Sequence, residues 1–136
     1  MDMNFNYETE GIRRGGVYWV PDLFKSTEGS TDEKISEETT KYHPWLVVSS
    51  DKNNIGKSSN VTAVILSTNL DTVWVPTHVV LNSYTNLKPS LVKCECIQTI
   101  SKDLIGTKLC QVRKTDMAII ERAMMEALQL PVSDEE

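Results

Sequence analysis

Two polar side chains, one imidazole and one hydroxyl, stand at the ends of two short apolar runs in the sequence. His43 precedes the run Trp45–Val48, and Ser67 directly follows the run Val61–Leu66. An imidazole can act as a general acid or base near neutral pH, and a serine hydroxyl can donate a hydrogen bond to a phosphate. A surface histidine and a serine that merely ends a strand are the alternative interpretation.

The two apolar runs are the elements that must position this pair. Both are short and rich in β-branched residues, which favours buried strands over helices. Antiparallel pairing through a hairpin loop over Asp51–Asn60 would place the start of the first strand beside the end of the second. His43 also precedes Pro44, and a residue before proline is biased to extended backbone. The sequence therefore predicts an imidazole and a hydroxyl at the same edge of a small sheet.

Other polar residues also have a functional and a structural interpretation. His78 lies in the extended segment Trp74–Leu81, where packing within a sheet is its alternative role. Glu95 lies between two cysteines of an apolar strand, so it either faces solvent or is placed to accept a hydrogen bond from a base amine. The lysines and asparagines of Asp51–Lys57 suit phosphate contacts, although a solvated hairpin tip is the ordinary role for such residues.

The chain has three cysteines, Cys94, Cys96 and Cys110. An odd number argues against a disulfide framework and favours a reducing cytoplasm. Cys94 and Cys96 are predicted to share one strand face, but three thiols without a fourth nearby ligand make a poor zinc site. We therefore expect buried free thiols. The sequence also has no phosphate-binding glycine loop, no HExxH and no CxxC, so we expect no metal and no other cofactor.

Length and composition predict one globular domain. The 136 residues suit a single core, and 40% hydrophobic and 24% charged residues are ordinary values. No run approaches the roughly 18 apolar residues that a membrane span needs. The acidic, polar start of the sequence does not resemble a secretory signal. We therefore expect a cytoplasmic protein without a membrane partner.

The net charge of −5 is unevenly distributed along the chain. Residues 26–40 contain five acidic residues and one lysine, and three more acidic residues end the sequence. Taking these eight acids and one base from the totals of 19 and 14 leaves 11 acidic and 13 basic residues. Such a body can bind RNA weakly through bulk electrostatics, with an affinity that falls as salt rises.

The rest of the chain is predicted to add strands around the central hairpin. Residues 1–12 are expected to form a loose arm, and residues 25–42, which are polar and without periodicity, a long acidic loop. Pro76 restricts its segment to an edge of the sheet or to the start of a strand. A helical turn capped by Ser101 is predicted over Ser101–Ile105. Further strands are predicted at Val17–Val20, Leu91–Ile100 and Lys108–Val112.

The last predicted element is an amphipathic helix. Thr115 or Asp116 is its candidate cap, Pro131 ends it, and residues 132–136 form an acidic tail. Strands followed by a closing helix predict a mainly β domain, a small bent sheet or barrel with a helix packed on it. The predicted apolar face of the helix consists of Met117, Ile120, Met124 and Leu128.

Four short motifs occur along the chain in a fixed order, and they are Arg14–Tyr18, His43–Val48, Pro76–Val79 and Glu95–Ile100. Together with the closing helix, they resemble the MazF/PemK-type toxins, or mRNA interferases, of bacterial type II toxin–antitoxin systems. The resemblance runs from about Arg13 to Leu130. It implies an SH3-like, CcdB-like β-barrel with a C-terminal α-helix over residues 13–131, working as a homodimer.

The same resemblance implies an activity. Members of this family are sequence-specific, metal-independent endoribonucleases that cut single-stranded mRNA. Attack by the 2′-hydroxyl gives a 2′,3′-cyclic phosphate, and a small acidic antitoxin protein blocks the RNA groove. Reading of extended, unpaired bases is the usual mode of sequence-specific RNA recognition.

Carried over by position, the resemblance gives His43 the general acid–base role and places Ser67 on the scissile phosphate. The family usually has arginine, threonine, aspartate and arginine where this sequence has His43, Ser67, Gly16 and Gln98. Serine keeps the hydroxyl of threonine, but an imidazole is not the permanent bidentate phosphate clamp that a guanidinium is. The predicted RNA-binding residues are Arg14, Lys52, Asn53, Thr68, Pro76, His78, Glu95 and Gln98.

Two other functions stay open at this point. A catalytically impaired member of the family would bind RNA or an antitoxin without cutting RNA. A CcdB-like poison would act on DNA gyrase, although Pro76-Thr77-His78 and His43-Pro44-Trp45 match the ribonuclease branch better. RNA cleavage separates the nuclease from both alternatives, and co-purification of gyrase would indicate the last.

Overall fold

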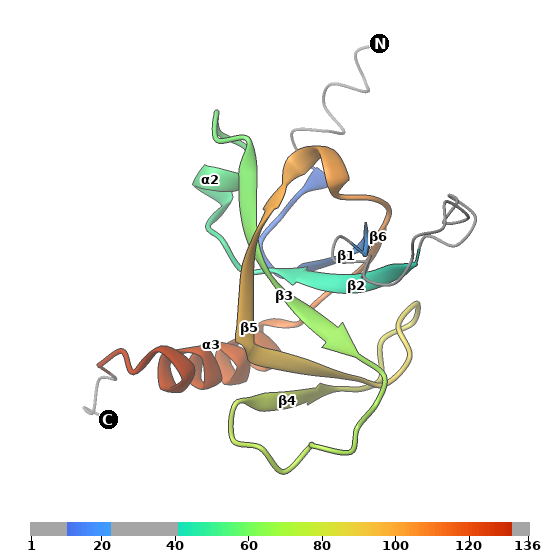
Figure 1. Cartoon of the computed structure of the whole chain (residues 1–136), viewed down its shortest axis with the longest axis vertical. Helices are drawn as coiled ribbons and strands as arrows, with labels where there is room; N and C mark the ends of the chain where they lie inside the picture. Colours follow the sequence, from blue (N-terminus) through green and yellow to red (C-terminus); the bar gives the residue numbers. More distant parts are fainter. Residues whose placement is uncertain (1–10, 23–40, 132–136) are drawn as a thin grey trace, which may run out of the picture.

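The computed structural model describes residues 11–22 and 41–131, which form one strongly curled sheet with a long helix packed on one face (Figure 1). The strand order is β4-β5-β3-β2-β1-β6, and neighbouring strands are antiparallel. The predicted mainly β fold with a C-terminal helix is therefore confirmed. The strands are β1 (Gly16–Pro21), β2 (Tyr42–Val47), β3 (Asn60–Ser67), β4 (His78–Leu81), β5 (Ser90–Ser101) and β6 (Lys108–Gln111).

Most of the predicted arm, most of the acidic loop and the acidic tail fall on residues 1–10, 23–40 and 132–136, which lie outside the described residues. In the part of the chain that the structure describes, no helix has the length and the apolar character that crossing a membrane requires.

The predicted central hairpin is present. Strands β2 and β3 pair with Trp45 opposite Ile65, and with Val47 opposite Ala63. The connection between them begins with a helical turn, α2 (Asp51–Asn54), which the sequence did not predict. It forms because the Ser50 side chain accepts a hydrogen bond from the backbone N–H at position 53, the usual role of an N-cap serine.

A bend in β5 divides the interior into two clusters of buried side chains. On β5, four residues separate Val92 from Ile97, whereas one residue separates their partners Leu66 and Val64 on β3. The bend lets the two halves of β5 face different clusters (Figure 1). One cluster packs against the helix and includes Val17, Leu46, Leu66, Val92 and Cys94. The other includes Tyr18, Val20, Trp45, Val61 and Ile100.

The bend also corrects the prediction that two cysteines share one strand face. Cys94 is completely buried in the cluster under the helix. Cys96 instead lines a pocket together with Trp45, which belongs to the other cluster. Strict alternation of side chains holds only along a regular strand, and the extra residues here interrupt it.

Strand β4 begins later than the sequence predicted. The segment before His78 forms successive turns, in which the N–H of Val73 bonds to the Leu70 oxygen and the N–H of Val75 bonds to the Thr72 oxygen. Trp74, which lies within these turns, is 75% exposed. The sequence predicts an edge strand or a strand start at Pro76; Pro76 lies in the turns two residues before β4, and β4 is the first strand of the sheet order.

The closing helix, α3 (Lys114–Leu128), starts without the predicted Thr115 or Asp116 cap. Its N-cap is Arg113, whose side chain caps nothing. The Tyr84 hydroxyl instead donates to Asp116 at 2.5 Å and accepts from the Arg113 N–H. The helix start is therefore held by a tertiary contact, and the residue after α3 has a left-handed backbone that ends it before Pro131.

The apolar face of α3 is shorter than predicted. Met117, Ile120 and Ala123 are buried, whereas Leu128 is 51% exposed. The end of the helix extends beyond the sheet (Figure 1), so no strand covers Leu128. The predicted turn after β5 is confirmed as η2 (Lys102–Leu104), with the Ser101 hydroxyl accepting from the N–H of Asp103.

Candidate functional site

The open end of the β2–β3 hairpin, away from α2, holds a pocket of about 350 Å³ that both His43 and Ser67 line. The register that pairs Trp45 with Ile65 places His43 opposite Ser67 two residues further along. The predicted meeting of an imidazole and a hydroxyl at one edge is therefore present. It arises because antiparallel pairing brings the first residues of one strand to the last residues of the other.

Both polar groups are available to a ligand. The Ser67 hydroxyl oxygen accepts a hydrogen bond from the N–H of Asn69 at 3.0 Å, which leaves its own proton for donation. Within the described part of the chain, no hydrogen bond engages the His43 imidazole. The site can therefore supply one proton-transfer group and one hydrogen-bond donor.

The walls of this pocket add groups that suit a nucleotide. Trp19 and Tyr42 are 38% and 56% exposed, large fractions for aromatic side chains, and both line it. Lys88 contributes a positive charge, and the predicted Thr68 lies here as well. Aromatic rings can stack on unpaired bases, and a lysine can contact phosphate.

Sequence reasoning did not select Trp19, Tyr42 or Lys88. Trp19 pairs directly with Pro44 across β1 and β2. Its position beside His43 could therefore have been predicted from the pairing of these two strands. Lys88 lies in the connection between β4 and β5, and its proximity to His43 depends on how that connection folds.

A second, smaller pocket of about 260 Å³ is also lined by His43. The predicted RNA-binding residue Gln98 lines it, and among the described residues no partner hydrogen-bonds its amide. His43 therefore forms a wall shared by two pockets. The smaller one is lined by Pro21, Asp22, His43, Trp45, Ile65, Cys96 and Gln98.

The predicted base contacts His78 and Glu95 are bound to each other. His78 Nε2 lies 2.8 Å from Glu95 Oε2, and the Thr77 hydroxyl donates to the other carboxylate oxygen at 2.8 Å. His78 Nδ1 lies 2.9 Å from the Thr72 carbonyl oxygen and donates to it, because a carbonyl can only accept. The pair therefore fastens the turns before β4 to β5.

This arrangement changes the acidity of Glu95. Partial burial alone would raise the pKa of its carboxyl group, but the hydrogen bonds from His78 and Thr77 outweigh burial and hold the pKa below its ordinary value. Pro76, also predicted to hold a base, lines a separate groove beside α3 together with His78.

Three predicted RNA-binding residues lie away from the His43 pocket. Arg14 donates to the carbonyl oxygen of Val48 and forms an ion pair with Glu121 on α3 at 2.5 Å. Lys52 and Asn53 belong to α2, at the closed end of the hairpin. The structure gives Arg14 a structural role and does not bring Lys52 or Asn53 to the open end.

The three cysteines are free thiols with suppressed acidity. Burial raises the pKa of Cys94 to about 12, and burial also raises the pKa of Cys96 and Cys110. A thiol that stays protonated is a poor nucleophile. No group of three or more potential metal ligands occurs in the described ranges.

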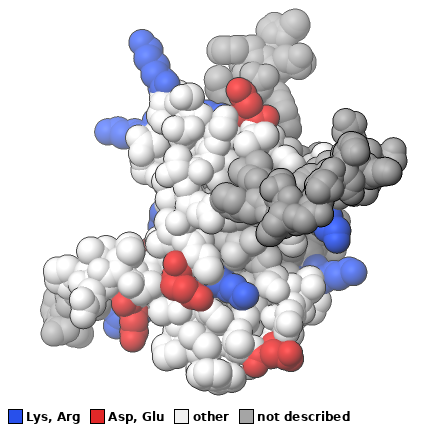
Figure 2. All heavy atoms as spheres, viewed as in Figure 1, with Lys and Arg blue, Asp and Glu red and all other residues white. Residues whose placement is uncertain are grey.

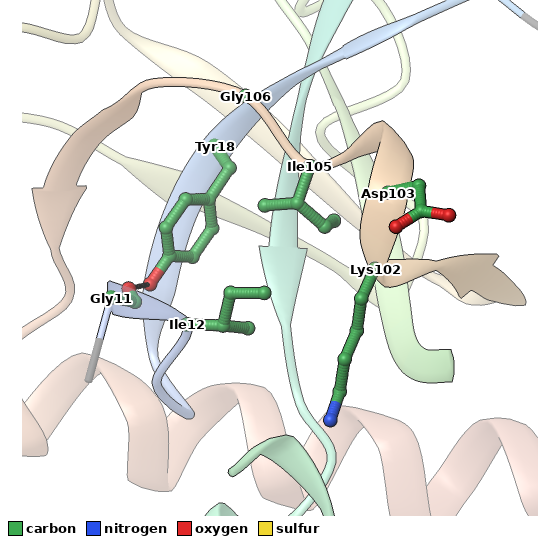
Figure 3. A pocket seen from close by; sticks show the side chains of 7 residues that line it. All are labelled: Gly11, Ile12, Tyr18, Lys102, Asp103, Ile105 and Gly106. Carbon is green, nitrogen blue, oxygen red and sulfur yellow. Dashed lines mark hydrogen bonds between the residues drawn. The ribbon is translucent and has the colours of Figure 1, made fainter. Parts of the chain in front are cut away.

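A further pocket of about 480 Å³ lies near η2 and contains neither His43 nor Ser67 (Figure 3). Its main polar groups already have partners. The Tyr18 hydroxyl donates to the Gly11 carbonyl oxygen and accepts from the Arg13 N–H, and Lys102 Nζ donates to the Gly56 carbonyl oxygen. We assign this pocket no role in the chemistry.

Comparisons with known proteins identify relatives over nearly the whole chain. A profile of the family described as PemK-like, MazF-like toxin of type II toxin–antitoxin system matches residues 13–128. No curated protein matches the sequence. A solved endoribonuclease from a mycobacterial species is 30% identical, with a TM-score of 0.68 over 90% of this chain and 95% of that one.

Two solved complexes show the same architecture. An endoribonuclease with its cognate antitoxin, from a mycobacterial species, is 30% identical, with a TM-score of 0.66 over 90% of this chain and 97% of that one. A MazE–MazF structure from Deinococcus radiodurans is 14% identical, with a TM-score of 0.68 over 88% of this chain and 97% of that one. The latter shows the fold alone.

Proposed function

The chain belongs to the PemK-like, MazF-like toxin family of type II toxin–antitoxin systems, and on this basis we propose that it is an endoribonuclease toxin that cleaves single-stranded mRNA. The observation that carries the proposal is the shared pocket of His43 and Ser67. The exposed aromatic rings beside them support an unpaired substrate, because only unstacked bases can stack on protein rings. A protein that cuts mRNA acts in the cytoplasm.

The proposed reaction uses the RNA as its own nucleophile. The 2′-hydroxyl oxygen attacks the adjacent phosphorus, a bond forms between them, and the bond from phosphorus to the 5′-oxygen breaks. The products are a 2′,3′-cyclic phosphate and a 5′-hydroxyl. No water is consumed, because one proton leaves the 2′-oxygen while another reaches the 5′-oxygen. The proposed step needs only these two proton transfers and no metal ion.

In this reaction His43 performs one of the two proton transfers, as a base toward the 2′-hydroxyl or as an acid toward the leaving oxygen. Ser67 donates a hydrogen bond to a non-bridging phosphate oxygen, where negative charge grows in the transition state. Lys88 on the same pocket wall adds positive charge. The family usually has an arginine where this chain has His43. In this chain the proposed proton-transfer group is therefore an imidazole.

A cleavage assay tests the proposal. Purified protein is incubated with a long RNA in the presence of EDTA, and the ends of the fragments are analysed. We expect a 2′,3′-cyclic phosphate, a roughly 10²- to 10⁴-fold slower reaction in His43→Ala, and a roughly 10²-fold slower one in Ser67→Ala. Ser59→Ala is the matched control, because Ser59 is exposed at the other end of β3.

Each negative outcome has a definite meaning. Equal cleavage by the wild type and His43→Ala would remove His43 from the mechanism. Tight RNA binding without products would favour a binding protein over a nuclease. Cleavage that stops with EDTA and returns with a divalent cation would contradict the metal-independent reaction.

We also propose a small acidic antitoxin as the natural partner. The similar mycobacterial endoribonuclease was solved with its cognate antitoxin, which supports this assignment. Outside residues 26–40 and the acidic end of the sequence, basic residues outnumber acidic ones by 13 to 11. The rest of the chain is therefore close to neutral, and its own charge repels an acidic partner only weakly.

A homodimer is the proposed assembly, and a groove of about 410 Å³ between β4 and α3 supports it. Val79, Val80 and Ile119 give the groove apolar walls, and Ile119 is 54% exposed. Arg122 and Glu126 lie one helical turn apart along it. Two copies related by a two-fold axis can pair each of these charges with the opposite charge of the other copy.

A further inference from the structure

We infer that the smaller pocket beside His43 holds one nucleobase of the RNA and that Gln98 selects that base. The inference rests on the proposed ribonuclease function and deepens it, because it assigns a base-reading residue to a pocket next to the reacting phosphate. The expected ligand is an adenine of the nucleotide on one side of the cleaved bond.

The shape and composition of the pocket suit a single planar ring system. Its volume of about 260 Å³ lies below the roughly 300–1,000 Å³ that is usual for drug-sized ligands. Trp45 and Ile65 provide apolar surface for the faces of a ring, and Trp45 is only 8% exposed. Polar groups from Asp22, His43 and Gln98 line the same space. A nucleobase has this combination of apolar faces and a polar edge.

Gln98 is the residue that can distinguish one base from another. Its side chain is half-buried, and its amide has no hydrogen-bond partner among the described residues. An unpaired, partly buried amide is unfavourable, so a ligand that pairs with it gains affinity. A carboxamide places a donor beside an acceptor, and the N6/N7 edge of adenine presents the complementary pair, which is the contact that glutamine makes with adenine in protein–DNA complexes.

The shared wall formed by His43 determines which nucleotide is read. The larger pocket contains Ser67 and Lys88 and is assigned the scissile phosphate, with the exposed rings of Trp19 and Tyr42 available for a neighbouring base. The smaller pocket adjoins the larger one, because His43 lines both. A base in it therefore belongs to a nucleotide that adjoins the cleaved bond.

The experiment maps every cleavage site on a long RNA of known sequence for the wild type, Gln98→Leu, Gln98→Glu and Thr99→Ala. Thr99 is the next residue of β5, is exposed and lines neither pocket. We expect wild-type sites to share adenine at one position flanking the cut. Gln98→Leu is expected to cut these sites roughly tenfold to hundredfold more slowly and to lose the preference at that position only.

The two remaining variants sharpen the test. A carboxylate accepts but does not donate, so Gln98→Glu is expected to turn from adenine toward guanine, whose N1–H and amino group donate side by side. Thr99→Ala is expected to match the wild type in both rate and preference. Unchanged preferences at both flanking positions in Gln98→Leu and Gln98→Glu would overturn the inference while leaving the ribonuclease function intact.

A binding measurement keeps the inference testable apart from catalysis. Fully 2′-O-methylated hexanucleotides, which lack the attacking hydroxyl, are compared in competition, with each of the four bases in turn at the flanking positions. Base-selective binding that disappears in Gln98→Leu would support the pocket even if the wild type cuts nothing, an outcome that would reject the proposed nuclease. Equal affinities for all four bases in the wild type would overturn the pocket.

Discussion

Glu95 is the residue whose role the structure changes most. The sequence suggested a carboxylate facing solvent or a base amine, whereas both of its oxygens take hydrogen bonds, from His78 and Thr77. His78 in turn is held by the Thr72 carbonyl oxygen. A carboxylate in this position stabilises the turns before β4, and any contact with RNA would use its remaining lone pairs.

The first prediction concerns the pH dependence of this contact. The pKa of Glu95 is lowered in the folded protein, so its carboxylate stabilises the fold above the unfolded pKa, and this is lost as pH falls through the folded pKa. Glu95→Gln is therefore expected to lower the free energy of unfolding at pH 7 and to have little effect near about pH 3. The side chain is 42% exposed, so solvent screening limits the difference to about 1 kcal/mol.

Urea unfolding of both proteins at the two pH values measures this difference. Asp71→Asn is the control, because Asp71 is exposed and is not part of the His78 contact. An equal difference between wild type and Glu95→Gln at both pH values would show that the charge of Glu95 does not stabilise the fold.

At the level of single elements, α3 shows that an apolar helix face is buried only where the sheet covers it. Ile120 is completely buried, but Leu128, two turns further along the same predicted face, is half exposed. The sheet covers the first part of the helix, where Met117 and Ala123 are also buried (Figure 1). The last turn of α3 therefore adds little to the core.

The second prediction follows from this difference in burial. Ile120→Ala is expected to lower the free energy of unfolding by about 2–5 kcal/mol, because it leaves a cavity under the helix. Leu128→Ala is expected to change it by less than about 0.5 kcal/mol. Urea denaturation at one fixed protein concentration compares the variants, and losses of equal size would contradict the burial seen here.

At the scale of the whole molecule, charge of both signs is spread over the face shown in Figure 2. Acidic and basic side chains are interspersed there over the described surface, and no single large basic patch is seen on this face. RNA binding in the proposed function therefore depends mainly on the pockets beside His43 and less on bulk electrostatics. A shallow dependence of affinity on salt is the corresponding expectation.

The third prediction concerns assembly. Ile119→Glu places a charge in the apolar groove between β4 and α3, so it is expected to convert a dimer into a monomer in sedimentation experiments. Ala118→Glu adds the same charge at an exposed neighbouring position that does not line the groove, and it is expected to leave the dimer intact. Dissociation by both variants, or by neither, would place the interface elsewhere.

Local sequence patterns were enough to predict the central hairpin and the closing helix. Each follows from short-range rules, namely side-chain alternation in strands and helical periodicity. The meeting of His43 with Ser67 followed from the same rules, because antiparallel register links residues through one turn. The ordered motifs also identified the toxin family, which the family profile confirms.

The positions of the remaining functional side chains depend on the tertiary fold. Arg14 contacts Glu121 across 107 positions of sequence, and Tyr84 holds the start of α3 across 32. The pocket of Gln98 exists because β1, β2, β3 and β5 each contribute a wall. Local patterns carry no information about such distant neighbours, since the curl of the sheet and the bend in β5 bring them together.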